Sequence, residues 1–258
     1  MRIAIISDIH ANLPALEEVL KAINKQKPDV IYCAGDVVNQ NLWNNEVVEL
    51  LQNQKIKVVQ GNHDKGIALG QKNFPFSYTF PDARKWGLEA IEYTLQQMTE
   101  KNRAVLAAYP PIQRLIYKAK NGGSLKLLLT HGSPKDVNER LYFFTAKSYF
   151  SSLLNDADTD VLLTGNTHQP HHIIIPCEIN GVTIYKHAIN PGSVGKPKDG
   201  DWRSSYAIIT LPANKALHTN ADALQVDFYR LKYDLGKVVK AIKKSKLPIY
   251  YGGCLISG

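Results

Sequence analysis

The chain has 258 residues, of which 44% are hydrophobic and 21% are charged, so it can form a core and is not a disordered, collagen-like or coiled-coil protein. Its apolar runs span only a few residues each, so we expect neither a membrane span nor a signal peptide and place the protein in the cytoplasm. The net charge of +8 favours anionic partners such as phosphate esters or nucleic acid.

The first sixty residues alternate apolar strands with amphipathic helices. Asn12 and Pro14 suit the start of the first helix, as an N-cap and a first-turn proline. The alternation predicts parallel strands joined by right-handed crossovers. The expected elements are strands at 2–7, 29–35 and 55–61, and helices at 13–26 and 43–54.

The rest of the chain follows a different pattern. Two segment pairs predict β-hairpins, one turning at Asn121-Gly122 and the other at Asn180-Gly181. We predict a single domain spanning residues 1–258, with one mainly parallel sheet and a second sheet rich in antiparallel hairpins. The other expected elements are a loop at 65–81, helices at 82–98, 99–108, 139–155 and 233–246, and strands at 160–164, 204–211 and 224–231.

Five of the predicted strands end in Asp, His or Asn, usually beside a glycine that lets the backbone turn tightly. Asp8-x-His10 and Gly35-Asp36 alone have an ordinary explanation as a helix cap or a turn, whereas no turn type requires the order Gly61-Asn62-His63-Asp64. Because ligands of α/β sheets bind outside the carboxyl ends of the strands, we expect all five to converge on one site. They are Asp8-Ile9-His10, Gly35-Asp36, Gly61-Asn62-His63-Asp64, His131-Gly132 and Gly165-Asn166-Thr167-His168.

The chemistry of these side chains indicates a metal-dependent hydrolase. Carboxylate oxygens together with imidazole nitrogens suit Mn, Fe or Zn. Asp36 can bridge two such ions, and a water between them would lose a proton near neutral pH and become a nucleophile. We expect His63 to act as the general acid for the leaving oxygen, with Asp64 orienting and stabilising its imidazole. These features predict a phosphoester hydrolase.

The order of the motifs resembles that of the calcineurin-like metallophosphoesterases, which is Asp-x-His, Gly-Asp, Gly-Asn-His-(Asp/Glu), a lone His and Gly-His-x-His. The stretches DIHANLPALEEVL, THGSPKD and NPGSVGKPKDGDWRSSYAII extend the resemblance to the small prokaryotic phosphodiesterase branch, over most of the chain. The resemblance implies an α/β fold, a four-layer α/β/β/α sandwich with two mixed β-sheets flanked by helices. It also implies two divalent or trivalent transition-metal ions.

The resemblance also assigns ligands by position. The first His of Gly-His-x-His is a ligand of the second ion in the family, and this chain has Asn166 there. An amide oxygen is a neutral donor, so we expect a weaker or differently selective second site. His171 and His172 are interpreted as ordinary strand residues. The implied ligands are Asp8, His10 and His168 for the first ion, Asp36 as the bridge, and Asn62, His131 and Asn166 for the second.

Hypotheses of different classes remain. The first is a dinuclear phosphoesterase that hydrolyses phosphodiesters by a metal-bridging hydroxide, with His63 as general acid. The second is a catalytically weak or inactive scaffold of the same fold that binds a protein or nucleotide partner, which Asn166 favours and an intact His63 disfavours. A nuclease is a third interpretation, but no basic groove with interleaved aromatic residues supports it. Loops 38–45 and 65–82 are expected to contact the substrate. No motif in the sequence identifies that substrate or the oligomeric state.

Overall fold

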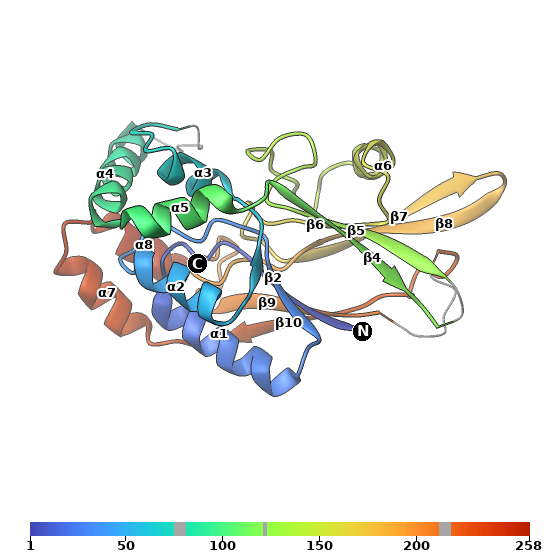
Figure 1. The fold of residues 1–258 in the computed structure, drawn as a ribbon, viewed down its shortest axis with the longest axis horizontal. Helices are drawn as coiled ribbons and strands as arrows, with labels where there is room; N and C mark the ends of the chain where they lie inside the picture. The colour runs from blue at the N-terminus through green and yellow to red at the C-terminus, as the bar shows by residue number, and fades with distance from the viewer. Residues whose placement is uncertain (75–80, 121–122, 212–217) are drawn as a thin grey trace.

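The computed structural model describes residues 1–74, 81–120, 123–211 and 218–258. They form two five-stranded sheets packed against each other, with helices on the outer face of each (Figure 1). The predicted α/β/β/α sandwich with two mixed sheets is confirmed. The turn expected at Asn121-Gly122 lies outside the described residues.

The first sheet has the strand order β10-β9-β1-β2-β3. The three N-terminal strands are parallel neighbours, as the β-α-β-α-β pattern predicts, but β9 and β10 join on antiparallel. The prediction of a mainly parallel sheet is therefore wrong, because the chain returns late to pair with the free edge of β1. The strands are β1 (Arg2–Ile6), β2 (Val30–Cys33), β3 (Lys57–Val58), β9 (Ser204–Thr210) and β10 (Gln225–Leu231).

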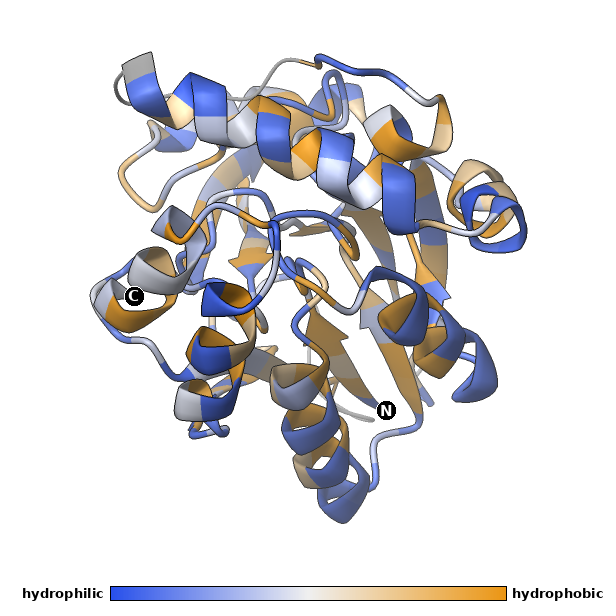
Figure 2. Ribbon diagram, turned by 90° about the vertical axis from the view of Figure 1, so that its left-hand side faces the viewer, coloured by the Kyte–Doolittle hydropathy of each residue, from blue (hydrophilic) through white to orange (hydrophobic). Residues whose placement is uncertain are grey.

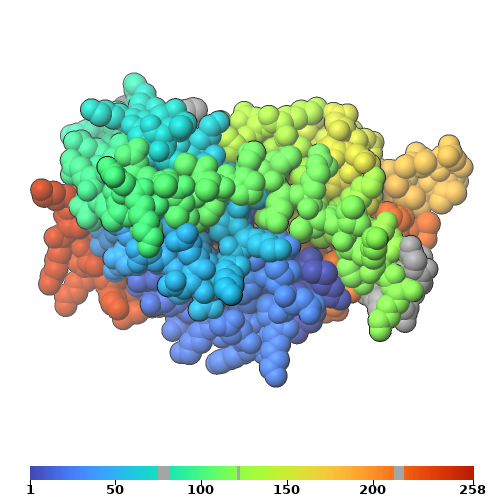
Figure 3. All heavy atoms as spheres, viewed as in Figure 1, coloured from blue at the N-terminus to red at the C-terminus, as the bar shows by residue number. Residues whose placement is uncertain are grey.

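The second sheet has the order β4-β5-β6-β8-β7 and is antiparallel at both edges. The hairpin predicted at Asn180-Gly181 is confirmed, and both turn residues have positive φ, as a two-residue hairpin turn requires. Its tip projects beyond the rest of the molecule, at the right of Figures 1 and 3. The strands are β4 (Ile112–Lys118), β5 (Ser124–Thr130), β6 (Val161–Leu163), β7 (His171–Ile179) and β8 (Val182–Asn190).

Eight helices lie in the described ranges, and none of them is long and apolar enough to cross a membrane. The helix expected over 139–155 starts only at Lys147, because the carbonyl of Glu139 accepts a hydrogen bond from Asn166 and the N–H of Tyr142 donates to Oγ1 of Thr145 instead of joining a helix. Two short helices, α3 and α8, were not expected. The helices are α1 (Leu13–Gln26), α2 (Asn44–Asn53), α3 (Asn62–Ala68), α4 (Pro81–Gln97), α5 (Glu100–Ala108), α6 (Lys147–Asp156), α7 (Leu235–Lys243) and α8 (Tyr250–Ser257).

Three apolar clusters separate the four layers. Alternate residues of β1 point to opposite faces, so Ala4 and Ile6 pack against helices while Ile3 and Ile5 pack between the sheets. The third cluster lies between the second sheet and α6, and includes Leu128 and Phe150. Figure 2 shows this arrangement as apolar strands inside and helices with polar outer faces. The layers hold the carboxyl ends of β1, β2, β3, β5 and β6 close together.

Candidate metal centre

The fold gathers the polar strand ends at one place, as the sequence predicts. Six of the expected side chains form three overlapping groups, and within each group one ligand atom per residue lies within 4.8 Å of the others. All six side chains are buried. The groups are Asp8, His10 and His168; His10, Asp36 and His63; and Asp8, Asp36 and His131.

In the first group, a ring nitrogen of His168 and a carboxylate oxygen of Asp8 face each other without a proton between them. Nδ1 of His168 donates to the backbone oxygen of Lys196, which leaves Nε2 unprotonated in the neutral ring. That Nε2 lies 3.3 Å from Oδ1 of Asp8, a buried oxygen with no hydrogen-bond partner in the described structure. The ammonium of Lys198 lies 3.2 Å from the same Nε2. The position therefore attracts positive charge, which is what a metal ion would provide.

His131 faces two oxygens in the second group, but across a proton. Its Nδ1 lies 2.7 Å from the backbone oxygen of Ala34 and donates to it, and its Nε2 faces Oδ2 of Asp36 at 3.3 Å and Oδ1 of Asn62 at 3.2 Å. Burial lowers the pKa of His131, but the charge of Asp36 and its hydrogen bond outweigh burial and raise this pKa to about 9. A cation between Nε2 and the two oxygens would take the place of that proton. The residues present thus fit a metal ion here as well.

The pKa values of the two carboxylates in the centre are shifted in opposite directions. Burial raises the pKa of Asp8 to about 6, and the negative charge of Asp36 adds to this effect. Burial acts in the same direction on Asp36, but the charges of His131 and His63 lower its pKa well below the usual range. Asp36 is therefore the more strongly ionised of the two, as the central group between the histidines.

Asn166 lies in the centre, held by hydrogen bonds on two sides. Its backbone N–H donates to Oδ2 of Asp8 at 3.1 Å, and its Nδ2 donates to the carbonyls of Glu139 at 3.1 Å and Val137 at 3.3 Å. An amide oxygen could not face two carbonyls, so these bonds fix the orientation of the carboxamide. Its Oδ1 is consequently the atom that can serve as a ligand.

His63 is held by a residue that the sequence did not single out. Nδ1 of His63 lies 2.9 Å from Nδ2 of Asn39, whose Oδ1 accepts from the backbone N–H of Gln40 at 2.8 Å. Because a backbone N–H can only donate, Oδ1 of Asn39 is the acceptor, and its Nδ2 donates to His63. The neutral imidazole then carries its proton on Nε2. A protonated Nε2 cannot bind a metal, so the geometry favours a donor role for His63 over a ligand role.

Asp64 has a different role from the one expected. Its Oδ2 accepts from the N–H of Gly61 at 3.0 Å, and its Oδ1 accepts from the N–H groups of Val37 at 2.8 Å and Val38 at 3.3 Å. The carboxylate thus stabilises the start of α3 and the loop after Asp36. The expectation that Asp64 orients the imidazole is corrected, because Asn39 makes the contact to Nδ1 of His63.

The backbone around the centre adopts conformations that L-residues seldom take. Of the twelve described non-glycine residues with positive φ, eight lie in these loops, and they include Asp8, His10, Asp36, Asn166 and His168. Such conformations cost on the order of 1 kcal/mol or more each, and they collect where surrounding structure holds functional groups in place. A Cβ on Gly165 would lie 2.0 Å from Oγ of Ser7, so only glycine allows this approach.

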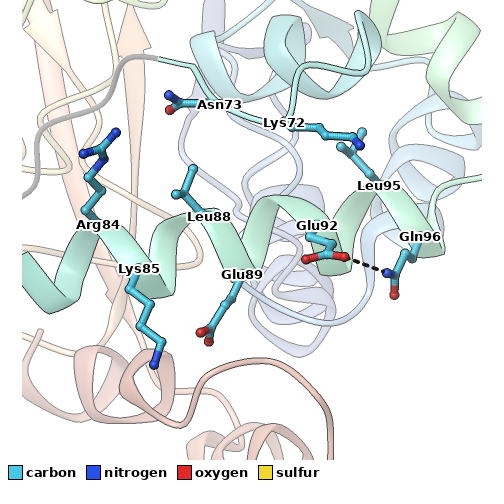
Figure 4. A pocket seen from close by; sticks show the side chains of 9 residues that line it. All are labelled: Lys72, Asn73, Arg84, Lys85, Leu88, Glu89, Glu92, Leu95 and Gln96. Carbon is cyan, nitrogen blue, oxygen red and sulfur yellow. Dashed lines mark hydrogen bonds between the residues drawn. The ribbon is translucent and has the colours of Figure 1, made fainter.

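A cavity of about 370 Å³ opens onto the centre. Its walls include Gln40 from loop 38–45, which was expected to contact the substrate. Other wall residues were not among the predicted site residues, and their signal is weak because they are basic and aromatic residues scattered along the sequence. They are Arg140, Tyr142, Lys196, Lys198, Tyr250 and Tyr251. A larger cavity of about 910 Å³ runs along α4 (Figure 4), but none of the candidate ligands lines it. The chemistry therefore points to the smaller cavity.

Comparison with known proteins agrees with this geometry. Residues 1–214 match the calcineurin-like phosphoesterase superfamily domain. The chain belongs to this superfamily. Membership gives this phosphoesterase its general class, a hydrolase of phosphoesters, and implies divalent metal ions as cofactors. The candidate ligand groups described above are consistent with such ions, whose identity the family does not specify.

Relatives of this phosphoesterase match it over nearly their full length. An uncharacterized protein of Methanocaldococcus jannaschii is 30% identical over 99% of this chain and 98% of its own. The crystal structure of a metallophosphoesterase from Sphaerobacter thermophilus is 30% identical, with a TM-score of 0.72 over 100% of this chain and 99% of that one. A hypothetical protein from Pyrococcus horikoshii, 22% identical, shares the fold with a TM-score of 0.77 over 100% of this chain and 98% of that one.

Proposed function

We propose that this phosphoesterase hydrolyses phosphodiesters at a centre that holds two metal ions. The observation that carries the proposal is that Nε2 of His168 and Nε2 of His131 each face a buried carboxylate oxygen at 3.3 Å, the first without a proton and the second across a position that a proton or a metal ion can occupy. When bound, the ions would supply Lewis-acid activation of water and of the phosphoryl oxygens. The proposed ligands are Asp8, His10 and His168 for the first ion, Asp36 for both, and Asn62, His131 and Asn166 for the second.

His63 is the proposed proton donor. Its Nε2 carries the proton of the neutral ring, since Nδ1 accepts from Asn39, and Nε2 lies 3.9 Å from Oδ2 of Asp36 on the wall of the cavity. A hydrogen bond from Nε2–H stabilises charge that develops on the leaving oxygen. Complete transfer of a proton as a general acid requires a ring protonated on both nitrogens, and burial lowers the pKa of His63 to about 4. The main contribution proposed for His63 is therefore hydrogen bonding.

The test combines metal analysis with hydrolysis of a generic aryl phosphodiester in the presence of Mn²⁺. We expect turnover by the wild type and a loss of about 100-fold or more in His63→Ala, with metal content retained. His171→Ala is the matched control, because His171 is also buried, but its Nδ1 bonds to the backbone oxygen of Gln169 outside the centre. A folded protein without turnover in any divalent metal would refute the enzyme and favour a binding scaffold of the same fold.

A further inference from the structure

A group of cationic side chains lies beside the candidate metal centre. Lys196, Lys198 and Arg140 line the same cavity as the candidate ligands. Lys196 is only 9% exposed, and its Nζ lies 2.7 Å from Oε1 of Gln40 and 5.0 Å from the ring centre of Tyr251. The ammonium of Lys196 is therefore held in a fixed orientation by a neutral amide and an aromatic ring.

Neither lysine of this group is neutralised by a carboxylate. The lysine ion pairs within the described ranges involve Lys21, Lys126 and Lys135, all of which lie elsewhere on the surface. Burying the ammonium of Lys196 with only neutral partners costs several kcal/mol. This cost is offset when an anion enters the cavity and pairs with the ammonium.

Charge balance indicates more than one negative charge on that anion. Asp8 and Asp36 would neutralise only half the charge of two divalent ions, and Lys196 and Lys198 add to the excess. A simple phosphodiester brings a single negative charge. A substrate with a second phosphoryl group next to the scissile one matches the cavity better.

An aromatic surface adjoins the cationic group. Tyr142 lines the cavity, and its ring stacks on Phe144 with centroids 5.0 Å apart and an interplanar angle of 5°. Phe143 and Phe144 are exposed next to it. Stacking of a nucleobase on an aromatic side chain contributes about 1–3 kcal/mol. The surface therefore suits the planar base of a nucleotide.

We propose that Lys196, Lys198 and Arg140 form a second phosphate subsite, and that the substrates are nucleotides with a disubstituted pyrophosphate link. This inference rests on the proposed phosphoesterase function. One phosphoryl group lies at the metal centre, its neighbour binds the three cationic side chains, and the base stacks on Tyr142. In the reaction, the oxygen of water forms a new P–O bond, the bridging P–O bond breaks, and the departing phosphate takes the proton that water loses.

The subsite is tested by anion binding to the Mn²⁺-loaded protein, measured by calorimetry without turnover. Inorganic pyrophosphate is expected to bind about 10-fold or more tightly than inorganic phosphate, and Lys196→Met is expected to remove most of this preference. Methionine keeps the contact with Tyr251 and removes a buried charge, so the variant should melt at or above the wild-type temperature. Lys198→Met, at an exposed residue, should lower the preference as well, and its metal content is measured alongside because Nζ of Lys198 lies 3.2 Å from Nε2 of His168. Lys101→Met, exposed on α5, is the control and should keep the preference.

Two results would overturn the subsite: no preference for pyrophosphate in the wild type, or an unchanged preference in both lysine variants. If the aryl phosphodiester is hydrolysed under either result, only this inference fails. Lysine-dependent pyrophosphate binding without any hydrolysis would support the subsite and refute the proposed function.

Binding of ADP tests whether the substrate is a nucleotide. ADP should bind more tightly than pyrophosphate, and Tyr142→Ala should weaken ADP about 5-fold or more while leaving pyrophosphate unchanged. Equal affinities of the wild type for ADP and pyrophosphate would overturn this part of the inference.

Discussion

Nδ2 of Asn39 donates to Nδ1 of His63 across 2.9 Å, and this contact decides which nitrogen of the imidazole holds the proton. Its direction is fixed because Oδ1 of Asn39 accepts from Gln40 and also from the hydroxyl of Thr94 at 3.1 Å. A carboxylate in place of this amide would reverse the arrangement, since it could only accept.

Asn39→Asp should therefore move the proton of the neutral ring to Nδ1 and leave Nε2 as an acceptor. We expect phosphodiester hydrolysis to fall by about 10- to 100-fold, because Nε2 can no longer donate to the leaving oxygen. Nitrogen NMR of the imidazole reports the tautomer directly. Asn41→Asp is the control, since Oδ1 of Asn41 accepts from the N–H of Leu42 and a carboxylate keeps that bond. Unchanged rate and tautomer in Asn39→Asp would contradict the assignment.

Gly165→Ala should disturb the first metal site. The added methyl group would lie 2.0 Å from Oγ of Ser7 and 2.9 Å from Oδ2 of Asp8, so the carboxylate has to move. We expect a loss of about 1–3 kcal/mol in the free energy of unfolding, together with lower metal content. Gly253→Ala in α8 meets no atom within 4 Å and should leave the metal content unchanged. Equal metal content in the two variants would show that Asp8 adjusts without loss of the ion.

Asn166→His should raise the occupancy of the second metal site. An imidazole nitrogen is a stronger donor to Mn, Fe or Zn than an amide oxygen, so the affinity for the second ion should increase about 10-fold or more. Metal titration followed by calorimetry, with the stoichiometry from elemental analysis, checks this expectation. Unchanged stoichiometry and affinity would mean that the amide oxygen of Asn166 is already a sufficient ligand.

The stability of the protein should fall in acid through His187. This buried residue faces His172 across β7 and β8, with His172 Nε2 and His187 Nδ1 3.0 Å apart. Burial lowers the pKa of His187 to about 3 from 6.5, so between these pH values the unfolded chain binds more protons. The contribution of neutral His187 to the free energy of unfolding is fully present above pH 6.5 and decreases by roughly 2 kcal/mol from pH 7 to pH 5.

Urea unfolding at several pH values separates this effect from packing. His187→Phe should show a smaller loss of stability between pH 7 and pH 5 than the wild type. Ile174→Val, opposite His187 in the strand pair, should lower stability by about 1 kcal/mol at every pH and keep the wild-type slope. Parallel slopes in the wild type and His187→Phe would exclude the proposed titration.

The fold was predictable from the sequence where the hydrophobic period was strong. The stripe on α1 and the apolar run of β1 mark their elements almost to the residue. The pattern fails for α8, whose Gly252 and Gly253 are poor helix formers, because packing against α7 decides its structure. It predicts β9 and β10 as strands but not their places in the first sheet, since the pairing of β9 with β1 depends on contacts far apart in the sequence.

The candidate centre was predictable in its members but not in its hydrogen bonds. Strand-end position is a local property, so Asp8, Asp36 and His131 could be grouped from the sequence alone. The partner of His63 could not, because Asn39 and Asp64 are both near it and only the loop conformation decides between them. Lys196 has only a weak local signal, its place after a glycine-containing turn, and its burial beside the cavity is what gives it importance.

The proposed ligands come from both sheets, and this gives metal binding a mechanical consequence. Asp8 follows β1 of the first sheet, whereas His168 follows β6 of the second, and their ligand atoms lie 3.3 Å apart. An ion held by both would act as a cross-link that closes a long stretch of chain and resists sliding of one sheet over the other. Such a centre is completed only after the sheets have docked, so metal capture would be a late event in folding and its release an early event in unfolding.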